Sequence, residues 1–169
     1  MTHKNLITGS PGITLKQAEK ILQKNKIEKR YTALVKGRWP KGKTIINAPL
    51  RKNQLSSGER IVKVDATGKA SVTHFEIIQR FDEATLMDVT LETGRTHQIR
   101  VHCQFSDAPI AGDQKYGDKL FNDNLKSKGN SRLFLHARYL KFRHPLSGDF
   151  VEIQAPLPKD LVALLEKLG

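Results

Sequence analysis

The chain has 169 residues and a net charge of +12, with 29 Lys and Arg against 17 Asp and Glu. This length suffices for one domain with its own core, and apolar runs of only a few residues are too short to span a membrane. The single cysteine, Cys103, excludes an internal disulfide and a cluster of thiolate metal ligands. No apolar stretch of the length of a secretory signal follows the basic start, so we expect a cytoplasmic protein. The positive charge suits a polyanion such as nucleic acid, but charge alone does not separate this from a basic soluble surface.

An amphipathic helix is the first element that the sequence predicts, over residues 14–26. Apolar side chains recur on one face at helical spacing, whereas Lys and Gln occupy the opposite face. Thr14 is a suitable N-cap for this helix. The residues ahead of it match no expected element, so the predicted organisation is an atypical N-terminal segment over residues 1–13 and one domain over residues 14–169.

Short strands dominate the rest of the chain, because apolar and polar residues alternate between turn signals of Gly, Asn, Asp and Pro. The strands expected from this pattern cover residues 31–37, 43–48, 58–64, 72–81, 83–90, 133–142 and 150–153. Helical spacing is expected over residues 95–105 and 160–168. The sequence therefore predicts the α+β class, with a mixed, mainly antiparallel sheet and flanking helices.

A dense group of polar residues lies between Gly94 and Asp118. The predicted helix in this stretch holds two arginines, two histidines and a glutamine, and each guanidinium must stay solvated or pair with an anion. This composition favours a polar site over a purely packing element. A metal centre is not expected, because His97, His102 and Cys103 lack the i, i+4 histidine pair of a helical zinc site.

A second group, Lys29-Arg30-Tyr31, opens the first predicted strand. A tyrosine beside a positive charge can act as a general acid or base, because the charge favours the phenolate. Taken alone, however, a tyrosine at the start of a strand is more typical of a packing residue with a solvated hydroxyl.

Several motifs occur in a fixed order along the chain. They are Lys29-x-Tyr31-x-Ala33-x-Val35, Thr93-Gly94-Arg95-Thr96-His97-Gln98-Ile99-Arg100-Val101-His102, Pro109-Ile-x-Gly112-Asp113-x-x-Tyr116-Gly117, Arg132-Leu133-x-Leu135-His136-Ala137 and His144-Pro145. Together they resemble the RNA pseudouridine synthases of the ribosomal large-subunit type, within the A-type family, and are most similar there to the synthase C type. The resemblance runs from about Leu15 to the end of the chain.

The resemblance implies the fold of a pseudouridine synthase catalytic domain and a chemistry. Such enzymes break the N-glycosidic bond of a uridine in RNA, turn the base and rejoin it through C5, with an aspartate nucleophile and no cofactor or metal. Tyr31 matches the tyrosine that lies against the target base and is the candidate for taking the C5 proton. Arg100 matches the arginine that pairs with the nucleophilic aspartate.

Further residues are implied to contact substrate or RNA, and the implied partner is large-subunit ribosomal RNA. Arg95 is expected to support the loop or contact RNA, and Leu135 to form part of the apolar wall of the uracil pocket. Lys29, His97 and Gln98 are the other expected contacts with RNA.

The nucleophile that the resemblance implies is missing from the sequence. In the family it lies in a His-Arg-Leu-Asp-x-x-Thr-Ser-Gly segment, ahead of the helix that precedes the tyrosine. All the aspartates follow Tyr31 and none has this surrounding pattern: Asp65, Asp82, Asp88, Asp107, Asp113, Asp118, Asp123, Asp149 and Asp160. We therefore expect an N-terminally truncated catalytic domain that is inactive alone. The loss of sheet strands is expected to leave an unpaired edge that favours self-association.

Two alternatives remain at this point. The chain can be a module that binds RNA through its basic surface without catalysis. A magnesium site built from Asp107, Asp113 and Asp118 is the other alternative, although structural hydrogen bonding is the better interpretation of Asp113 and Asp118.

Overall fold

A six-stranded sheet organises the chain in the computed structural model, which describes residues 14–16 and 27–169. The predicted helix over residues 14–26 falls almost entirely outside these residues. The strand order is β2-β5-β6-β1-β7-β8, and each described pairing is antiparallel. The α+β class with a mainly antiparallel sheet is thus confirmed.

The bounds of the described elements follow the predicted pattern closely in most places. The strands are β1 (Glu28–Lys36), β2 (Ile45–Asn47), β3 (Leu50–Gln54), β4 (Arg60–Val64), β5 (Val72–Arg80), β6 (Ala84–Leu91), β7 (Leu135–Arg143) and β8 (Phe150–Gln154). The helices are α3 (Gln98–Phe105), α4 (Lys119–Ser127) and α5 (Lys159–Leu168). Strand β3 and helix α4 were not expected from the sequence pattern.

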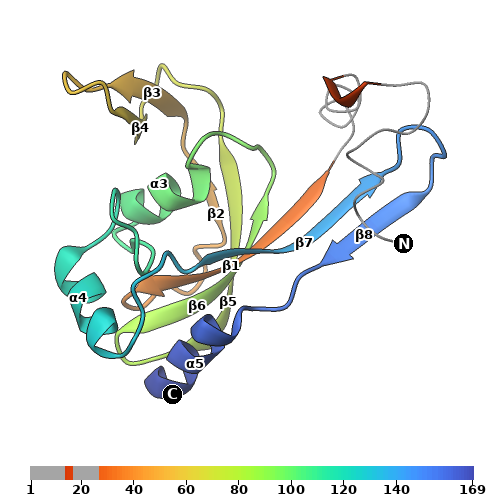
Figure 1. The fold of residues 1–169 in the computed structure, drawn as a ribbon. Helices are drawn as coiled ribbons and strands as arrows, with labels where there is room; N and C mark the ends of the chain where they lie inside the picture. Colours follow the sequence, from red (N-terminus) through yellow and green to blue (C-terminus); the bar gives the residue numbers. More distant parts are fainter. Residues whose placement is uncertain (1–13, 17–26) are drawn as a thin grey trace.

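Strand β1 lies at the centre of the sheet and is buried on both faces. Ala33, Leu34 and Val35 are all fully buried, so side chains on both faces of the middle of this strand are covered. Ala33 and Val35 belong to the apolar cluster under α3, and Leu34 belongs to the cluster under α4 and α5. The sheet is therefore covered by helices on both faces around this point, as Figure 1 illustrates.

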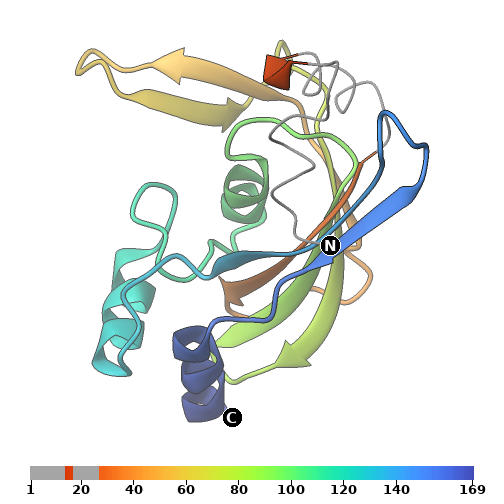
Figure 2. The same ribbon diagram turned by 45° about the vertical axis from the view of Figure 1, so that its right-hand side comes forward.

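A second, two-stranded sheet projects from the main body. Strands β3 and β4 pair from Leu50↔Val64 to Gln54↔Arg60, and both views place this hairpin away from the six-stranded sheet (Figures 1 and 2). Its apolar side chains pack in a small cluster of their own with Val101 of α3 and Tyr116. We call residues 50–64 the β3–β4 hairpin.

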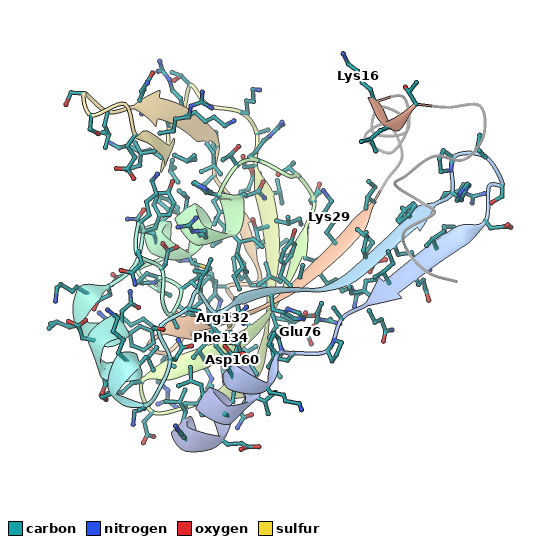
Figure 3. The ribbon with its side chains drawn as sticks, viewed as in Figure 1. Lys16, Lys29, Glu76, Arg132, Phe134 and Asp160 are labelled. Carbon is teal, nitrogen blue, oxygen red and sulfur yellow. The ribbon has the colours of Figure 1, made fainter. Side chains whose placement is uncertain are left out.

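The connection into β7 joins the helices to the sheet. The backbone N–H of Phe134 donates to the carbonyl of Ala111, and the carbonyl of Phe134 accepts from Leu34. Close by, Arg132 forms an exposed ion pair with Asp160 at the start of α5, with 3.3 Å between Nη1 and Oδ2 (Figure 3). Strand β7 pairs with β1 on one side and with β8 on the other, and β8 is the outer strand at this edge of the sheet.

Within the described residues, no helix has the length and apolar character that a membrane crossing requires.

Candidate functional site

The loop that enters α3 is held by the side chain of Gln98. Its Oε1 accepts hydrogen bonds from Thr93 Oγ1 (2.8 Å) and from the backbone N–H of Arg95 (3.0 Å). Its Nε2 donates to the carbonyl of Val72 and to Thr73 Oγ1, both at 2.9 Å. Gln98 is 2% exposed. Because its amide is engaged within the protein, any contribution of Gln98 to RNA binding acts through the loop that it holds.

The buried polar network continues one helical turn along α3 at His102. Its Nε2 lies 2.9 Å from the carbonyl of Ala48, which can only accept, so Nε2 carries the proton. Its Nδ1 then accepts from the hydroxyl of Thr73 at 2.7 Å. Burial lowers the pKa of His102, and the hydrogen bond to Ala48 opposes this only in part. His102 is therefore a neutral structural residue in a core position.

The backbone at His97 explains why the helix begins later than its sequence pattern predicts. His97 has a φ of 54°, in the left-handed region, and α3 starts at the next residue. The ring Nδ1 of His97 lies 2.8 Å from the hydroxyl of Tyr116. Burial, together with the charges of Arg100 and Lys115, lowers the pKa of His97. The neutral ring can accept a hydrogen bond from the Tyr116 hydroxyl at Nδ1.

Arg100, the second arginine of the motif, is engaged by Asp113. Two parallel bonds of 2.8 Å join Nε to Oδ2 and Nη2 to Oδ1. The Asp113 carboxylate is fully buried and also accepts the backbone N–H groups of Lys115 and Tyr116 at 2.9 Å. These bonds outweigh the burial that raises the pKa of Asp113, so the pKa is lowered overall and the carboxylate is charged.

Two glycines make the turn around Asp113 possible. Gly112 has a φ of 76°, and a Cβ there would overlap the carbonyl of Arg132. A Cβ at Gly117 would overlap the carbonyl of Asp113. Neither position has room for a side chain, which explains the Gly-Asp-x-x-Tyr-Gly spacing in physical terms.

Tyr31 and the residues expected beside it lie on β1 and β7. Tyr31 is half-buried and packs against the core cluster that also receives Leu135 of β7. Lys29, two residues earlier on the same face, points its Nζ to the neighbourhood of Gly94. Lys29 and Tyr31 line a hollow of about 310 Å³ with Leu140, Ile153 and other residues of β7 and β8. Burial raises the pKa of the Tyr31 phenol, so the hydroxyl is protonated in this structure.

The expected site residues thus fall into two neighbouring groups. Lys29, Tyr31 and Leu135 belong to the sheet, while His97 and Arg100 belong to the cluster around Asp113 and Tyr116. In the described part of the chain, no hydrogen bond or ion pair joins Tyr31 to Arg100. Arg95, in the loop between the two groups, donates from Nε to the carbonyl of Ala70 at 3.0 Å and is otherwise exposed.

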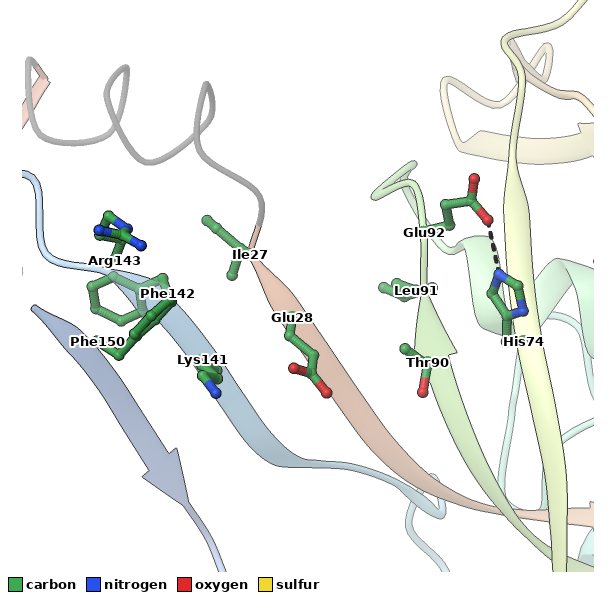
Figure 4. A pocket seen from close by; sticks show the side chains of 10 residues that line it. All are labelled: Ile27, Glu28, His74, Thr90, Leu91, Glu92, Lys141, Phe142, Arg143 and Phe150. Atoms are coloured by element: carbon green, nitrogen blue, oxygen red, sulfur yellow. Dashed lines mark hydrogen bonds and ion pairs between the residues drawn. The ribbon is translucent and has the colours of Figure 1, made fainter. Parts of the chain in front are cut away.

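A larger cleft, of about 920 Å³, opens where the start of β1 separates from β6 (Figure 4). Inside it, His74 Nε2 donates a hydrogen bond of 2.8 Å to Glu92 Oε2. None of the residues expected at the site lines this cleft.

Two of the three aspartates weighed as magnesium ligands, Asp113 and Asp118, have structural partners instead. Asp118 caps α4 by accepting the backbone N–H of Phe121 and also pairs with Lys36 at 2.7 Å. Asp113 is bound as described above. Among residues 14–16 and 27–169, no group of three or more His, Cys, Asp or Glu side chains is arranged to hold a metal ion. Structural hydrogen bonding by Asp113 and Asp118 is confirmed.

Tyr116 belongs to this site, although the sequence analysis assigned no function to it. Its hydroxyl accepts the backbone N–H of Val62 on β4 at 3.1 Å, across 54 positions of sequence. No local spacing reveals such a partner. The only available signal was its place in the Gly112-to-Gly117 motif.

Comparison with known proteins places these features in a family. Residues 6–105 match the RNA pseudouridylate synthase family. The chain is 44% identical over 163 residues to ribosomal large subunit pseudouridine synthase C of Pasteurella multocida, covering 96% of this chain and 50% of that protein. It is 44% identical over 165 residues to the Escherichia coli K12 protein of the same name, covering 96% of this chain and 52% of that protein.

Solved structures agree with the sequence comparison. Human RNA pseudouridylate synthase domain containing 1 superimposes with a TM-score of 0.71 at 25% identity, covering 85% of this chain and 60% of that one. The chain spans about half the length of the curated relatives it matches. The match over residues 6–105, more than half of the sequence, shows that the chain belongs to the RNA pseudouridylate synthase family.

Proposed function

We propose that this chain supplies part of the active site of an isomerase that converts uridine to pseudouridine in large-subunit ribosomal RNA. The observation that carries the proposal is the Gly94 to His102 segment, whose loop is fixed by buried bonds while Arg95 stays exposed and Arg100 is oriented by a buried carboxylate. The printed names of the relatives support large-subunit ribosomal RNA as the substrate class.

In this proposal Arg100 is the docking point for the nucleophilic carboxylate. Asp113 engages Nε and Nη2, and the described residues offer no hydrogen-bond acceptor to Nη1. Nη1 is thus available to a second carboxylate. A guanidinium held on one edge by a buried aspartate is already oriented when that carboxylate arrives, which favours its ionised form.

Tyr31 is proposed to take the C5 proton of the base. The raised pKa of its phenol means that the hydroxyl is a proton donor in this structure, and proton removal therefore requires a positive charge to move close to it. Lys29 of the same strand also lines this hollow and is a candidate for that charge.

We also propose that the chain does not isomerise uridine without an aspartate from a His-Arg-Leu-Asp segment, which the 169 residues do not contain. The test incubates the chain with unmodified large-subunit ribosomal RNA and maps pseudouridine, with and without a polypeptide that carries this segment. Pseudouridine is expected only in the mixture. Tyr31→Phe and Arg100→Ala should each abolish it, while Lys126→Ala on α4 should not. Pseudouridine formed by the chain alone would overturn the requirement for the added aspartate.

Binding of RNA without catalysis is the alternative, and the net charge of +12 suits an RNA partner in either case. Affinity for ribosomal RNA that falls steeply with salt, with no pseudouridine in either arm of the same experiment, would select this alternative.

Self-association through a sheet edge is a further part of the proposal. Strand β8 is an outer strand of the main sheet, and Phe150 on it is 62% exposed. An exposed edge with apolar side chains can pair with a second copy. Sedimentation velocity should detect a dimer. Glu152→Pro should weaken this dimer, because residue 152 alternates with Val151, which bonds opposite Phe142, so the backbone N–H of residue 152 faces away from β7. A monomer at all concentrations would contradict the proposal.

A further inference from the structure

We propose that Tyr116 is a positioning residue that couples the β3–β4 hairpin to the guanidinium of Arg100. The inference rests on the proposed function only for the importance of Arg100, since the coupling itself is a matter of contacts. Tyr116 is 2% exposed, and its ring lies under Arg100, with 5.0 Å between Cζ and the ring centroid. The opposite end of the side chain, the hydroxyl, reaches Val62 of β4 and His97 at the start of α3.

The hairpin depends on this contact for its place in the molecule. A two-stranded hairpin alone is only marginally stable, so it must bury apolar surface elsewhere. Leu50 and Val62 do so in a small cluster with Val101 and Tyr116, while Val64 of β4 also packs against the large cluster under α3. Tyr116 thus gives the hairpin both a polar and an apolar contact.

A second tie comes from the preceding residue. Lys115 donates from Nζ to the backbone carbonyl of Arg60 and pairs with Glu59 at 3.0 Å, so two consecutive residues hold β4. Both Lys115 and Tyr116 donate their backbone N–H groups to Oδ1 of Asp113. The same Asp113 carboxylate receives Arg100.

These contacts connect β4, Tyr116, Asp113 and Arg100 in one continuous network. A displacement of β4 moves Tyr116 through its hydroxyl and ring, and Tyr116 in turn moves Arg100 by direct contact and through Asp113. The consequence is that the hairpin and Arg100 cannot shift independently as long as Tyr116 is intact.

The experiment uses the whole chain and follows the ¹⁵N signal of Arg100 Nε by NMR. Val62→Ala removes packing between the hairpin and Tyr116 while the backbone N–H of residue 62 is kept. We expect this change to move the Arg100 Nε signal and to speed its hydrogen exchange. Val151→Ala, the same change on β8, should leave the signal in place. An unmoved Arg100 Nε signal in Val62→Ala would overturn the proposal, whatever the outcome with other variants.

Tyr116→Phe supplies the second arm, because it keeps the ring and removes the hydroxyl. Hydrogen exchange at the amide of Val62 should rise roughly tenfold, as expected for the loss of one hydrogen bond in a locally opening segment. In this background Val62→Ala should move the Arg100 signal less than in the wild-type chain, because the ring contact remains while the hydroxyl contact is gone. Tyr139→Phe removes a hydroxyl that bonds exposed Glu152 and should change neither readout. Equal effects of Val62→Ala with and without the Tyr116 hydroxyl would show that the hydroxyl carries no coupling. None of these measurements needs RNA or catalysis. A negative result for the coupling is therefore distinct from a negative result in the isomerisation assay.

Discussion

The carboxylate of Asp113 and the guanidinium of Arg100 face each other across two parallel hydrogen bonds of 2.8 Å, with the carboxylate fully buried and the Arg100 side chain 19% exposed. This arrangement gives the second arginine of the motif a permanent partner within the chain. The partner expected from the family resemblance was a nucleophile in a segment that the sequence lacks. The pair instead orients Arg100 independently of that segment.

Removal of the charge on Asp113 should destabilise the fold. The carboxylate accepts four hydrogen bonds, whereas the amide of Asp113→Asn has one acceptor oxygen and turns an NH₂ group toward donors. We expect a loss of about 3 kcal/mol in the free energy of unfolding, since one member of a buried pair is left without compensation. Urea denaturation measures it. Asp123→Asn, the same change in the exposed pair with Lys119, is the control and should have little effect.

The Asp113–Arg100 pair should also make the free energy of unfolding depend on pH in the acidic range. The folded-state pKa of Asp113 is lowered, so its contribution is fully present above the unfolded pKa of about 4 and is lost as the pH falls through the folded value. Unfolding free energies measured at a series of pH values should fall more steeply below about pH 4 for the wild-type chain than for Asp113→Asn. Other carboxylates contribute equally to both curves, so parallel curves would mean that Asp113 gives no such stabilisation.

His102 should make the free energy of unfolding decrease as the pH falls, in a pH range above the one in which Asp113 acts. Burial lowers its folded-state pKa, so the neutral ring is favoured by folding. The stabilisation is fully present above the unfolded pKa of about 6.5 and is lost as the pH falls from there through the folded value. We expect unfolding free energies to decline over this range, by at most about 1.4 kcal/mol per pH unit for each histidine. His102→Gln, which cannot take up a proton, should flatten the curve. An unchanged slope would point to His97 instead, whose pKa is also lowered.

The alternating strands and the family motifs were readable in the sequence because both are local patterns. Strand β3 was missed because its sequence, Leu-Arg-Lys-Asn-Gln, is polar and mostly exposed, and its pairing with β4 is what makes it a strand. Helix α4 was missed because Phe121 and Leu125 provide only one turn of apolar spacing in a segment rich in Asn, Asp and Lys. Strand β3 therefore has no apolar alternation of its own, whereas α4 is amphipathic but is only nine residues long and mostly polar.

The site was predictable in composition but not in its bonds. The sequence pointed to the polar segment around Arg95 and Arg100, yet it could not separate Gln98, whose amide is buried, from residues that face solvent. Gln98 and His102 lie one helical turn apart on the same side as Ile99, and this spacing was the available signal. The contact between Tyr116 and Val62 joins distant parts of the chain, so only the folded structure reveals it.

Two glycines with nearly equal φ distinguish the energetic cost of a positive φ from the energetic cost of close packing. Gly112 and Gly148 have φ values of 76° and 75°, but a Cβ at Gly112 would overlap the backbone of Arg132, whereas a Cβ at Gly148 would meet open space. Gly148→Ala should cost about 1 kcal/mol, for the left-handed conformation alone. Gly112→Ala should cost several-fold more, because it forces apart the turn that carries Asp113 and the strand connection at Arg132.

Thermal or urea unfolding of the two variants gives the comparison directly. The Gly112→Ala variant should also lose the Arg100 Nε signal of the native chain, since the turn that holds Asp113 shifts, whereas Gly148→Ala should retain it. Equal destabilisation in both variants would mean that the backbone near Arg132 moves aside at little cost. In that case the motif glycine would be required for its φ alone, and the tight approach of the two segments would not be what fixes the Asp113 turn.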